Sequence, residues 1–263
     1  MFDVLLPVFN GEKTIKKTLD SISAQKALPT KVVIIIDGCN DGTEQIVDEY
    51  IEKNILNISK IVLKKNQGIV AALNKGLENC KSSWVARVDA DDYWLPDHLS
   101  SIRDAIQVNK LNIGLIASTA KIVKDDKITH TTLSYKDQDL RKALIKDNPF
   151  VHSSVAYKLK AVIDTGGYRN LYKYEDYDLW IRLLSKYRGE IIDSQTCVHV
   201  KSDDSLTRKY SFNNILEERL KVQLLAFKEF GFISFYGPIF IILSSLRLIY
   251  RKFTTILFRK LKF

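Results

Sequence analysis

The chain has 263 residues, of which 46% are hydrophobic, and a formal net charge of +9. This length can bury one sizeable core, but it excludes two large catalytic domains. Most of the positive charge lies at the end of the sequence, because residues 247–263 contain six Lys or Arg and no acid. These basic residues alternate with Phe, Ile and Leu, which suits an anionic membrane surface and argues against a nucleic-acid partner.

The cysteines and the first residues indicate a reducing compartment. Cys39, Cys80 and Cys197 are odd in number and widely spaced, so they predict neither a disulfide framework nor a zinc site. The opening sequence FDVLLP lacks the basic region and the long apolar run of a secretory signal. We therefore expect the catalytic part of the chain in the cytoplasm.

The first ninety residues alternate between short apolar runs and helical patterns. The apolar runs are rich in β-branched residues and predict buried strands at 4–6, 31–36, 61–63 and 84–88. Between them, apolar residues recur on single helical faces, as Ile15, Leu19 and Ile22 do in the first interval. This order predicts an α/β domain with a mainly parallel sheet, helices on both faces, and ligands beyond the carboxyl ends of the strands.

The later elements are less regular. We predict a helix at 96–109 with Pro96 in its first turn, and a strand at 113–118. A turn at 124–127 and a polar helix or mobile loop at 135–147 follow. No repeat or low-complexity linker interrupts the sequence, so we expect one catalytic domain over 1–229 and a basic, apolar tail over 230–263.

Three polar loops follow the predicted strands: PVFNG at 7–11, DGCNDGT at 37–43 and DADD at 89–92. The composition of the second loop also suits a tight turn and a helix cap, so the residues alone leave both interpretations open. The third loop holds three carboxylates in four residues, which repel one another unless a cation neutralises them. Mg²⁺ or Mn²⁺, with diphosphate oxygens completing the shell, is the expected occupant.

These loops resemble those of family 2 glycosyltransferases, in order and spacing, together with NQG at 66–68, LPD at 95–97 and EDYDLW at 175–180. The resemblance covers about residues 1–207 and implies a GT-A fold, a nucleotide-sugar donor and inversion at the anomeric carbon. It implies a metal ligand, Asp91, and a donor site made of Pro7, Phe9, Asn10, Asp37, Asn66, Gly68, Asp89 and Ala90. Within that site, Asp37 would bind the base and Asp89 the ribose. The chain departs from the family pattern in Ile36, where members usually have a second acid, and in Cys39, where they have Ser.

The EDYDLW motif supplies the candidate base. An acceptor alcohol becomes a good nucleophile when a carboxylate takes its proton, and the resemblance assigns this role to Asp176. Glu175 would contact the acceptor or support the base. Alternatively, Asp176 only caps the helix that follows. The segment NPFVHSS at 148–154 resembles the family's stretch before the GGY turn at 166–168, and we expect it to enclose the site and exclude water.

Two histidines have less certain places in this pattern. We interpret His152 as a satisfied buried histidine. Many relatives carry a histidine where this chain has Ser202, so a third protein ligand to the metal is not expected there. His199 is close enough to replace it, although an ordinary strand histidine is the interpretation we prefer.

The tail suggests where the enzyme works. Residues 230–246 carry no charge, but Gly231, Gly237 and Pro238 dilute a run that is shorter than the roughly 20 residues of a spanning helix. We expect an amphipathic segment on the cytoplasmic face of the plasma membrane; spanning, and packing on the core or on a second subunit, are the alternatives. A glycan or lipid-linked oligosaccharide of bacterial surface polysaccharide biosynthesis is then the expected acceptor.

Two other functions compete with sugar transfer. A sugar-nucleotide pyrophosphorylase also uses an α/β sheet and a metal, but it needs a Gly-rich basic loop after the first strand, which this chain lacks. A catalytically inactive membrane-bound scaffold is opposed by the presence of both Asp91 and Asp176. UDP is favoured as the carrier because relatives most often use it.

Overall fold

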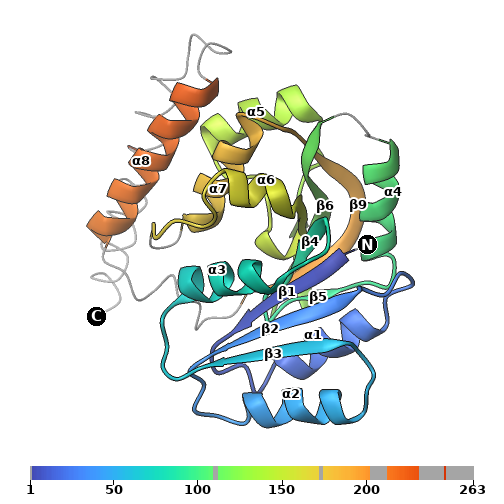
Figure 1. Ribbon diagram of the computed structural model, residues 1–263. Helices are drawn as coiled ribbons and strands as arrows, with labels where there is room; N and C mark the ends of the chain where they lie inside the picture. Colours follow the sequence, from blue (N-terminus) through green and yellow to red (C-terminus); the bar gives the residue numbers. More distant parts are fainter. Residues whose placement is uncertain (1, 109–111, 172–173, 202–211, 231–245, 247–263) are drawn as a thin grey trace, which may run out of the picture.

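The computed structural model describes residues 2–108, 112–171, 174–201, 212–230 and 246 (Figure 1). A nine-stranded sheet with the order β3-β2-β1-β4-β8-β6-β9-β5 forms its centre, and β7 pairs with β6. The strands are β1 (Phe2–Val8), β2 (Lys31–Asp37), β3 (Ile58–Leu63), β4 (Trp84–Arg87), β5 (Tyr93–Trp94), β6 (Ile113–Lys124), β7 (Lys127–Thr131), β8 (Val155–Lys158) and β9 (Arg188–Val200). The helices are α1 (Ile15–Ser23), α2 (Thr43–Glu52), α3 (Ile69–Asn79), α4 (His98–Val108), α5 (Asp137–Lys146), α6 (Leu159–Asp164), α7 (Glu175–Leu184), α8 (Phe212–Phe230) and the short 3-10 helix η1 (His152–Ser154).

The first four strands lie parallel to one another. β1 pairs with β2 and β4, and β2 pairs with β3. The four strands and three helices that the sequence predicts here are confirmed, although β3 begins three residues earlier than expected. Because parallel strands end at the same edge of a sheet, the polar loops after β1, β2 and β4 come together there.

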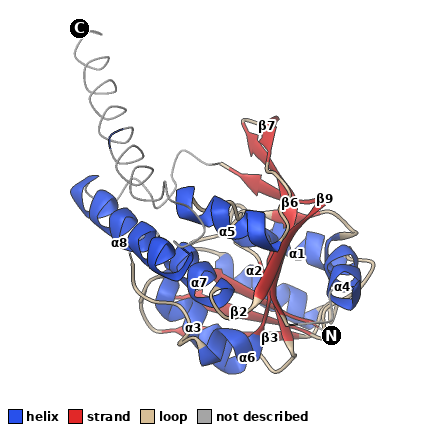
Figure 2. Cartoon of the chain, turned by 90° about the horizontal axis from the view of Figure 1, so that it is seen from above, coloured by secondary structure: helices blue, strands red, loops and turns tan. Residues whose placement is uncertain are grey.

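The sheet separates two hydrophobic cores. Along β1, Leu5 belongs to the core that includes side chains of α3, α6 and α7, whereas Val4 and Leu6 belong to the core that includes side chains of α1, α2 and α4. This alternation follows from the two-residue period of a strand, whose successive side chains point to opposite faces. The continuous apolar runs in the sequence therefore mark strands that are covered on both faces, as Figure 2 shows.

The second half of the sheet mixes directions. β8 lies antiparallel between β4 and β6, and the long β6 pairs in parallel with β9. β6 extends to Lys124, six residues beyond the predicted end. The predicted turn at 124–127 joins β6 to β7, with Asp125 and Asp126 at φ values of 49° and 58°. The segment at 135–147 is largely the helix α5 rather than a loop, and the predicted helix at 96–109 begins at His98.

Helix α8 packs against the domain that contains the sheet. It lies against α5 and α7 and buries Val222, Ala226 and Phe230. Within the part of the chain that the structure describes, no helix is long and apolar enough to cross a membrane. Apart from Phe230 and Leu246, the predicted tail at 230–263 lies outside the described residues, as does Ser202.

Candidate active site

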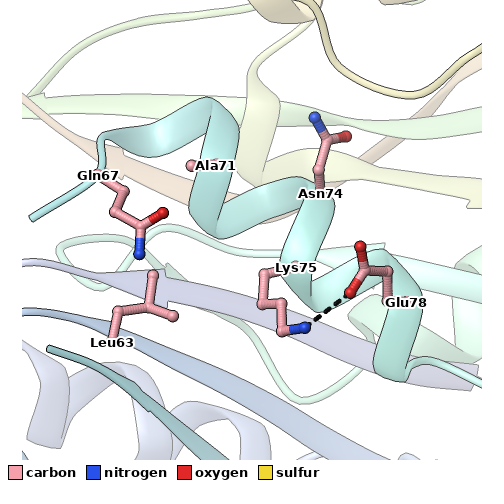
Figure 3. Close-up of a pocket in the computed structure, with 6 residues that line it drawn as sticks. All are labelled: Leu63, Gln67, Ala71, Asn74, Lys75 and Glu78. Carbon is pink, nitrogen blue, oxygen red and sulfur yellow. Dashed lines mark hydrogen bonds and ion pairs between the residues drawn. The ribbon is translucent and has the colours of Figure 1, made fainter.

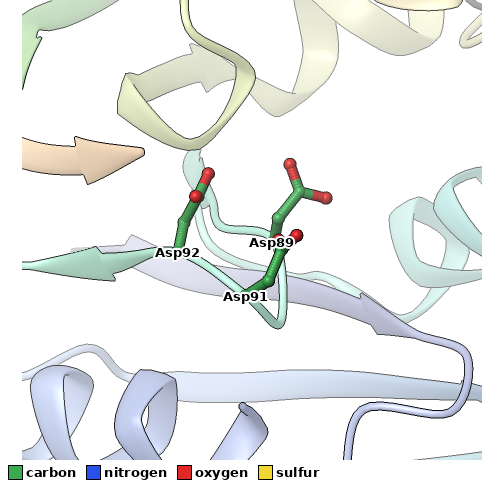
Figure 4. Close-up of side chains that lie close together, drawn as sticks. All are labelled: Asp89, Asp91 and Asp92. Carbon is green, nitrogen blue, oxygen red and sulfur yellow. The ribbon is translucent and has the colours of Figure 1, made fainter. Parts of the chain in front are cut away.

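The DADD loop follows β4 and brings three carboxylates together. One oxygen from each of Asp89, Asp91 and Asp92 lies within 4.8 Å of the others (Figure 4). Asp91 is exposed, yet desolvation by the surrounding loop and the charges of its two neighbours raise its pKa to about 7. A bound cation would remove this repulsion, so the residues fit the hard divalent ion that the sequence predicts.

Asp89 is fixed by a residue that the sequence reasoning missed. The guanidinium of Arg87 is buried, donates a hydrogen bond to Asp89 Oδ1 and forms an ion pair with Asp89 Oδ2. Burial alone would raise the pKa of Asp89, but the Arg87 charge and hydrogen bonds outweigh it and lower that pKa. The one sequence signal for this role is a basic residue in an otherwise apolar strand, facing the same side as the acid two residues later.

Asp92 is buried and is held by three groups. Ser153 donates its hydroxyl to Asp92 Oδ2, and the Val200 N–H donates to Oδ1 over 2.9 Å. The His199 Nδ1 lies 3.0 Å from both oxygens, and its pKa is raised because this carboxylate outweighs the effect of burial. His199 therefore contacts the acidic loop through Asp92, which goes beyond the ordinary strand histidine that we preferred.

The loop after β2 is joined to the start of α3. Asp37 is buried, and its two carboxylate oxygens accept the N–H groups of Gln67 and Gly68 at 2.8 and 2.9 Å. A Cβ on Gly38 would lie 2.4 Å from the backbone nitrogen of Asn66, so this close approach requires glycine. The predicted donor-site residues Asp37, Asn66 and Gly68 thus lie together. Two hydrogen bonds of the Asp37 carboxylate, the predicted ligand of the base, are already made within the protein.

The remaining predicted donor residues lie at the same edge. Pro7 is buried in β1, whereas Phe9 is 42% exposed just beyond it. Asn10 accepts the N–H of Asn40 on its side-chain oxygen at 3.0 Å, which joins the first and second loops. The carbonyl of Ala90 accepts the Thr18 hydroxyl at 3.0 Å, so the third loop is anchored to α1.

Glu175 and Asp176 form the first turn of α7. The N-cap position belongs to Tyr174, and Asp176 lies in the first turn, where a carboxylate interacts favourably with the helix N-terminus, so this position also fits the helix-stabilising alternative. Its Oδ1 accepts the N–H of Tyr177 at 2.6 Å, and its Oδ2 accepts the Asn148 amide at 2.9 Å. Burial raises the pKa of Asp176 to about 6, and burial together with the Asp176 charge raises that of Glu175 to about 8.

One short segment connects the base to the acidic loop. Asn148 contacts Asp176, and five residues later the Ser153 hydroxyl oxygen accepts the Asp89 N–H at 3.0 Å. Five residues span at most about 17 Å even when fully extended. Asp89 and Asp176, 87 positions apart in the sequence, therefore lie at the two ends of one short segment, and the Asp89 charge contributes to the raised pKa of Asp176.

The same segment carries His152, whose Nε2 lies 3.0 Å from the hydroxyl of Tyr168. The His152 ring also meets the ring of Trp180 edge to face, with centroids 5.7 Å apart. Burial holds the pKa of His152 well below its usual value. These contacts are those of a satisfied histidine, as expected.

A surface cavity of about 320 Å³ lies beside α3 (Figure 3). Its lining consists of Leu63, Gln67, Ala71, Asn74, Lys75 and Glu78. It adjoins the donor loops through Gln67, but no residue of the acidic loop lines it. This cavity is therefore separate from the cluster of carboxylates.

The sequence of this chain matches the model of glycosyl transferase family 2 over residues 3–166. The chain belongs to this family. It is 30% identical to the amylovoran biosynthesis glycosyltransferase AmsE of Erwinia amylovora over 246 residues, which cover 89% of each protein. It is also 29% identical to the UDP-Gal:alpha-D-GlcNAc-diphosphoundecaprenol beta-1,3-galactosyltransferase of Escherichia coli, over 70% of this chain and 68% of that protein.

Solved structures show the same fold. S. aureus TarS 1–349 in complex with UDP-GlcNAc superimposes with a TM-score of 0.72 at 20% identity, over 85% of this chain and 66% of that one. The mannosyltransferase PcManGT of Pyrobaculum calidifontis, in complex with GDP-Man and Mn²⁺, has a TM-score of 0.65 at 18% identity, over 94% of this chain and 69% of that one. The predictions of a GT-A fold and of a glycosyltransferase are confirmed, which removes support for a pyrophosphorylase and for an inactive scaffold.

Proposed function

We propose that this glycosyltransferase moves a sugar from a nucleotide sugar, with UDP as the favoured carrier, to a hydroxyl of a glycan or lipid-linked acceptor. The transfer depends on Mn²⁺ or Mg²⁺ and inverts the anomeric carbon. The observation that carries this proposal is the segment 148–154, which contacts both the candidate base and the acidic loop. A base placed next to a diphosphate site is what transfer to an alcohol requires.

The donor site is proposed at the edge where β1, β2 and β4 end. Phe9 and Pro7 line the nucleoside pocket, with Asn10 beside them. Asp37, Asn66 and Gly68 surround the base, while Asp89 and Ala90 hold the ribose. The relatives support this choice of donor, because one is named for UDP-Gal and TarS is complexed with UDP-GlcNAc.

Asp91 is proposed as the ligand of the divalent ion. Its carboxylate is exposed on the acidic loop. The carboxylates of its two neighbours already have protein partners, since Asp89 contacts Arg87, and Asp92 contacts Ser153 and His199. When bound, the ion would neutralise the negative charge that develops on the leaving diphosphate. The Mn²⁺ in the PcManGT complex supports a metal of this kind in the family fold.

Asp176 is proposed as the base. Its carboxylate takes the proton of the acceptor hydroxyl while that oxygen bonds to the anomeric carbon on the face opposite the diphosphate, which inverts the configuration. A pKa raised to about 6 brings the basicity of this carboxylate closer to what proton abstraction near neutral pH needs. The pKa of Glu175 is raised further, to about 8, so Glu175 is largely protonated at pH 7. We propose that this neutral Glu175 supports the ionised Asp176.

The place of action is proposed from the composition of the tail. Residues 1–229 form the catalytic domain, and the basic, apolar segment 230–263 attaches it to the anionic cytoplasmic face of the plasma membrane. An acceptor in bacterial surface polysaccharide biosynthesis fits this location. The relatives named for amylovoran and for a diphosphoundecaprenol acceptor support it.

A donor panel tests the function directly. Release of nucleoside diphosphate is measured with UDP-, GDP- and dTDP-sugars, with Mn²⁺, with Mg²⁺ and with EDTA. We expect the highest turnover with a UDP-sugar, and we expect this turnover to be lost when EDTA removes the metal. Metal-independent turnover would refute the role of Asp91, and the absence of binding to every nucleoside diphosphate would refute the proposal as a whole.

A further inference from the structure

We propose that Asn148 is the residue that positions Asp176 for proton abstraction. This inference rests on the proposed role of Asp176 as the base. Asn148 lies just after α5, 28 positions before Asp176 in the sequence, and its side chain is half-buried between α5 and α7. The family match and the sequence patterns give it no role of its own.

The orientation of the Asn148 amide is fixed by the backbone. Its Oδ1 accepts the N–H of Phe150 at 3.1 Å, two residues further on, as in an Asx turn. Because a backbone N–H can only donate, the oxygen of the amide must face Phe150 and the NH₂ group must face Asp176. The 2.9 Å contact to Asp176 Oδ2 is therefore a donation to the carboxylate.

Asp176 is held at both of its oxygens. The N–H of Tyr177 donates to Oδ1 and the Asn148 amide donates to Oδ2, so the two contacts fix the plane of the carboxylate. An ionised carboxylate has about four acceptor sites, and two remain for an acceptor hydroxyl. Donors to the charged form also favour that form, so Asn148 opposes the effect of burial on the Asp176 pKa.

Other charged and titratable groups act on Asp176 from each element around it. Arg87 of β4 favours the ionised form, whereas Asp89 disfavours it. Among the described residues, Glu175 on α7, Tyr168 after the glycine turn, and Tyr174 and Tyr177 at the start of α7 also interact with it. Asn148 differs from all of these because it is the side chain that donates a hydrogen bond directly to the carboxylate.

The chain on both sides of Asn148 is anchored. Before it, the Gln223 side chain of α8 donates to the carbonyl of Lys146 at 3.1 Å. After it, Phe150 is buried, with its ring 5.7 Å from that of Trp180 on α7. A donor that is held on both sides stays at a set distance from the base, which is what preorganisation of a catalytic group requires.

The substitution Asn148→Asp separates positioning from turn formation. Aspartate keeps an oxygen for the Phe150 N–H, so the Asx turn is retained, but it replaces the donor with a second carboxylate beside Asp176. Two carboxylates in contact share a proton. We expect the acidic limb of the pH profile of kcat to move up by about two pH units, with kcat at pH 7 about tenfold lower.

The matched variants complete the experiment. Asn148→Ala removes both the donor and the turn, and we expect kcat to fall about tenfold with a smaller shift of the acidic limb. Asn79→Ala, in which the lost amide donates to the Lys75 carbonyl within α3, serves as the Asn→Ala control and should match the wild type. All are assayed with saturating donor, acceptor and Mn²⁺, and the KM for the donor should stay within about twofold because the donor loops are unchanged.

The outcomes separate this inference from the proposed function. If Asp176→Asn is inactive but Asn148→Asp has the wild-type profile, Asn148 does not position the base and this inference fails alone. If Asp176→Asn is fully active, both fail. Should Asn148→Asp not fold, the acidic limb of Asn148→Ala decides the matter, and an unchanged limb would overturn the inference.

Discussion

The donor half and the acceptor half of the site are built by different means. The donor groups lie on loops that directly follow β1, β2 and β4, and the parallel strands bring them to one edge. Asp176, the proposed acceptor-side base, lies on a helix, and its partners come from the segment 148–154 and from β4. Donor geometry thus follows from sheet topology, whereas base geometry depends on contacts between distant segments.

This difference predicts two kinds of defect. Variants of the acidic loop should impair the binding of metal and nucleotide, whereas variants around Asp176 should impair transfer and leave nucleotide binding intact. Arg87 connects the two halves, because it pairs with Asp89 and also favours the charged form of Asp176. The experiments below test this division, beginning with the largest expected effect.

Asp176→Asn should lower kcat about 1000-fold, within the range found when a general base is removed. The amide keeps the shape of the side chain but cannot take the proton. Steady-state transfer to acceptor measures the loss, and Asp164→Asn, on the exposed end of α6, is the control. Full transfer by Asp176→Asn would place the base elsewhere.

Asp91→Ala should lower kcat/KM about 100-fold, which corresponds to about 3 kcal/mol of lost stabilisation of the diphosphate charge. Raising the Mn²⁺ concentration should recover part of the activity, because Asp89 and Asp92 remain nearby. Asp97→Ala is the control, since Asp97 forms an exposed ion pair with Lys26 outside the cluster. Equal losses in both variants would contradict a specific role for Asp91.

Arg87→Met should lower the free energy of unfolding by about 3 kcal/mol, because it leaves the Asp89 carboxylate without its buried partner. Urea unfolding followed by circular dichroism measures this change. Lys16→Ala removes an exposed pair with Asp20 and should cost less than about 0.5 kcal/mol. A similar loss of unfolding free energy in the two variants would show that the buried pair of Arg87 with Asp89 does not stabilise the site.

The wild-type kcat should fall about tenfold for each pH unit below about 6. The proposed base Asp176 is active in its ionised form, and a pKa raised to about 6 means that half of it is protonated at that pH rather than near 4. Saturating Mn²⁺ keeps Asp91 ionised during the assay, so the acidic limb reports on the acceptor half. Activity that is constant down to pH 5 would contradict a raised pKa for the base.

Gly167→Ala should destabilise the fold more than Gly166→Ala, by about 1 kcal/mol. Both glycines have positive φ and share the cost of a left-handed backbone, but an added Cβ at Gly167 would lie 2.7 Å from the Asn74 Oδ1, and one at Gly166 would meet no atom within 4 Å. Thermal unfolding of the two variants gives the comparison. Equal melting temperatures would show that the contact of this turn with α3 is unimportant.

The sequence predicted the strands and helices of the proposed donor half well because their signals are local. Apolar runs, helical spacing and the loops that follow them lie within a few residues of one another, and β1 to β4 with α1 to α3 appear as expected. The strand at 113–118 was predicted too short. Its continuation to Lys124 depends on pairing with β7 and β9, which no local pattern reveals.

The acceptor half was only partly predictable, for the same reason. The EDYDLW motif marked Asp176, but its partner Asn148 lies 28 residues away, and the contact of Ser153 with Asp89 spans 64 residues. Arg87, a charge in a buried strand, was not singled out from the sequence, and its pairing with Asp89 required the structure. The contact of His199 with Asp92 spans 107 residues and was likewise not predicted.

The most direct test of one shared site is calorimetric titration of UDP with Mn²⁺ into wild type, Asp91→Ala and Asp176→Asn, together with transfer assays on the same preparations. We predict that Asp91→Ala loses metal-dependent binding, whereas Asp176→Asn binds UDP like the wild type and transfers no sugar. Wild-type binding and wild-type transfer by either variant would contradict the account.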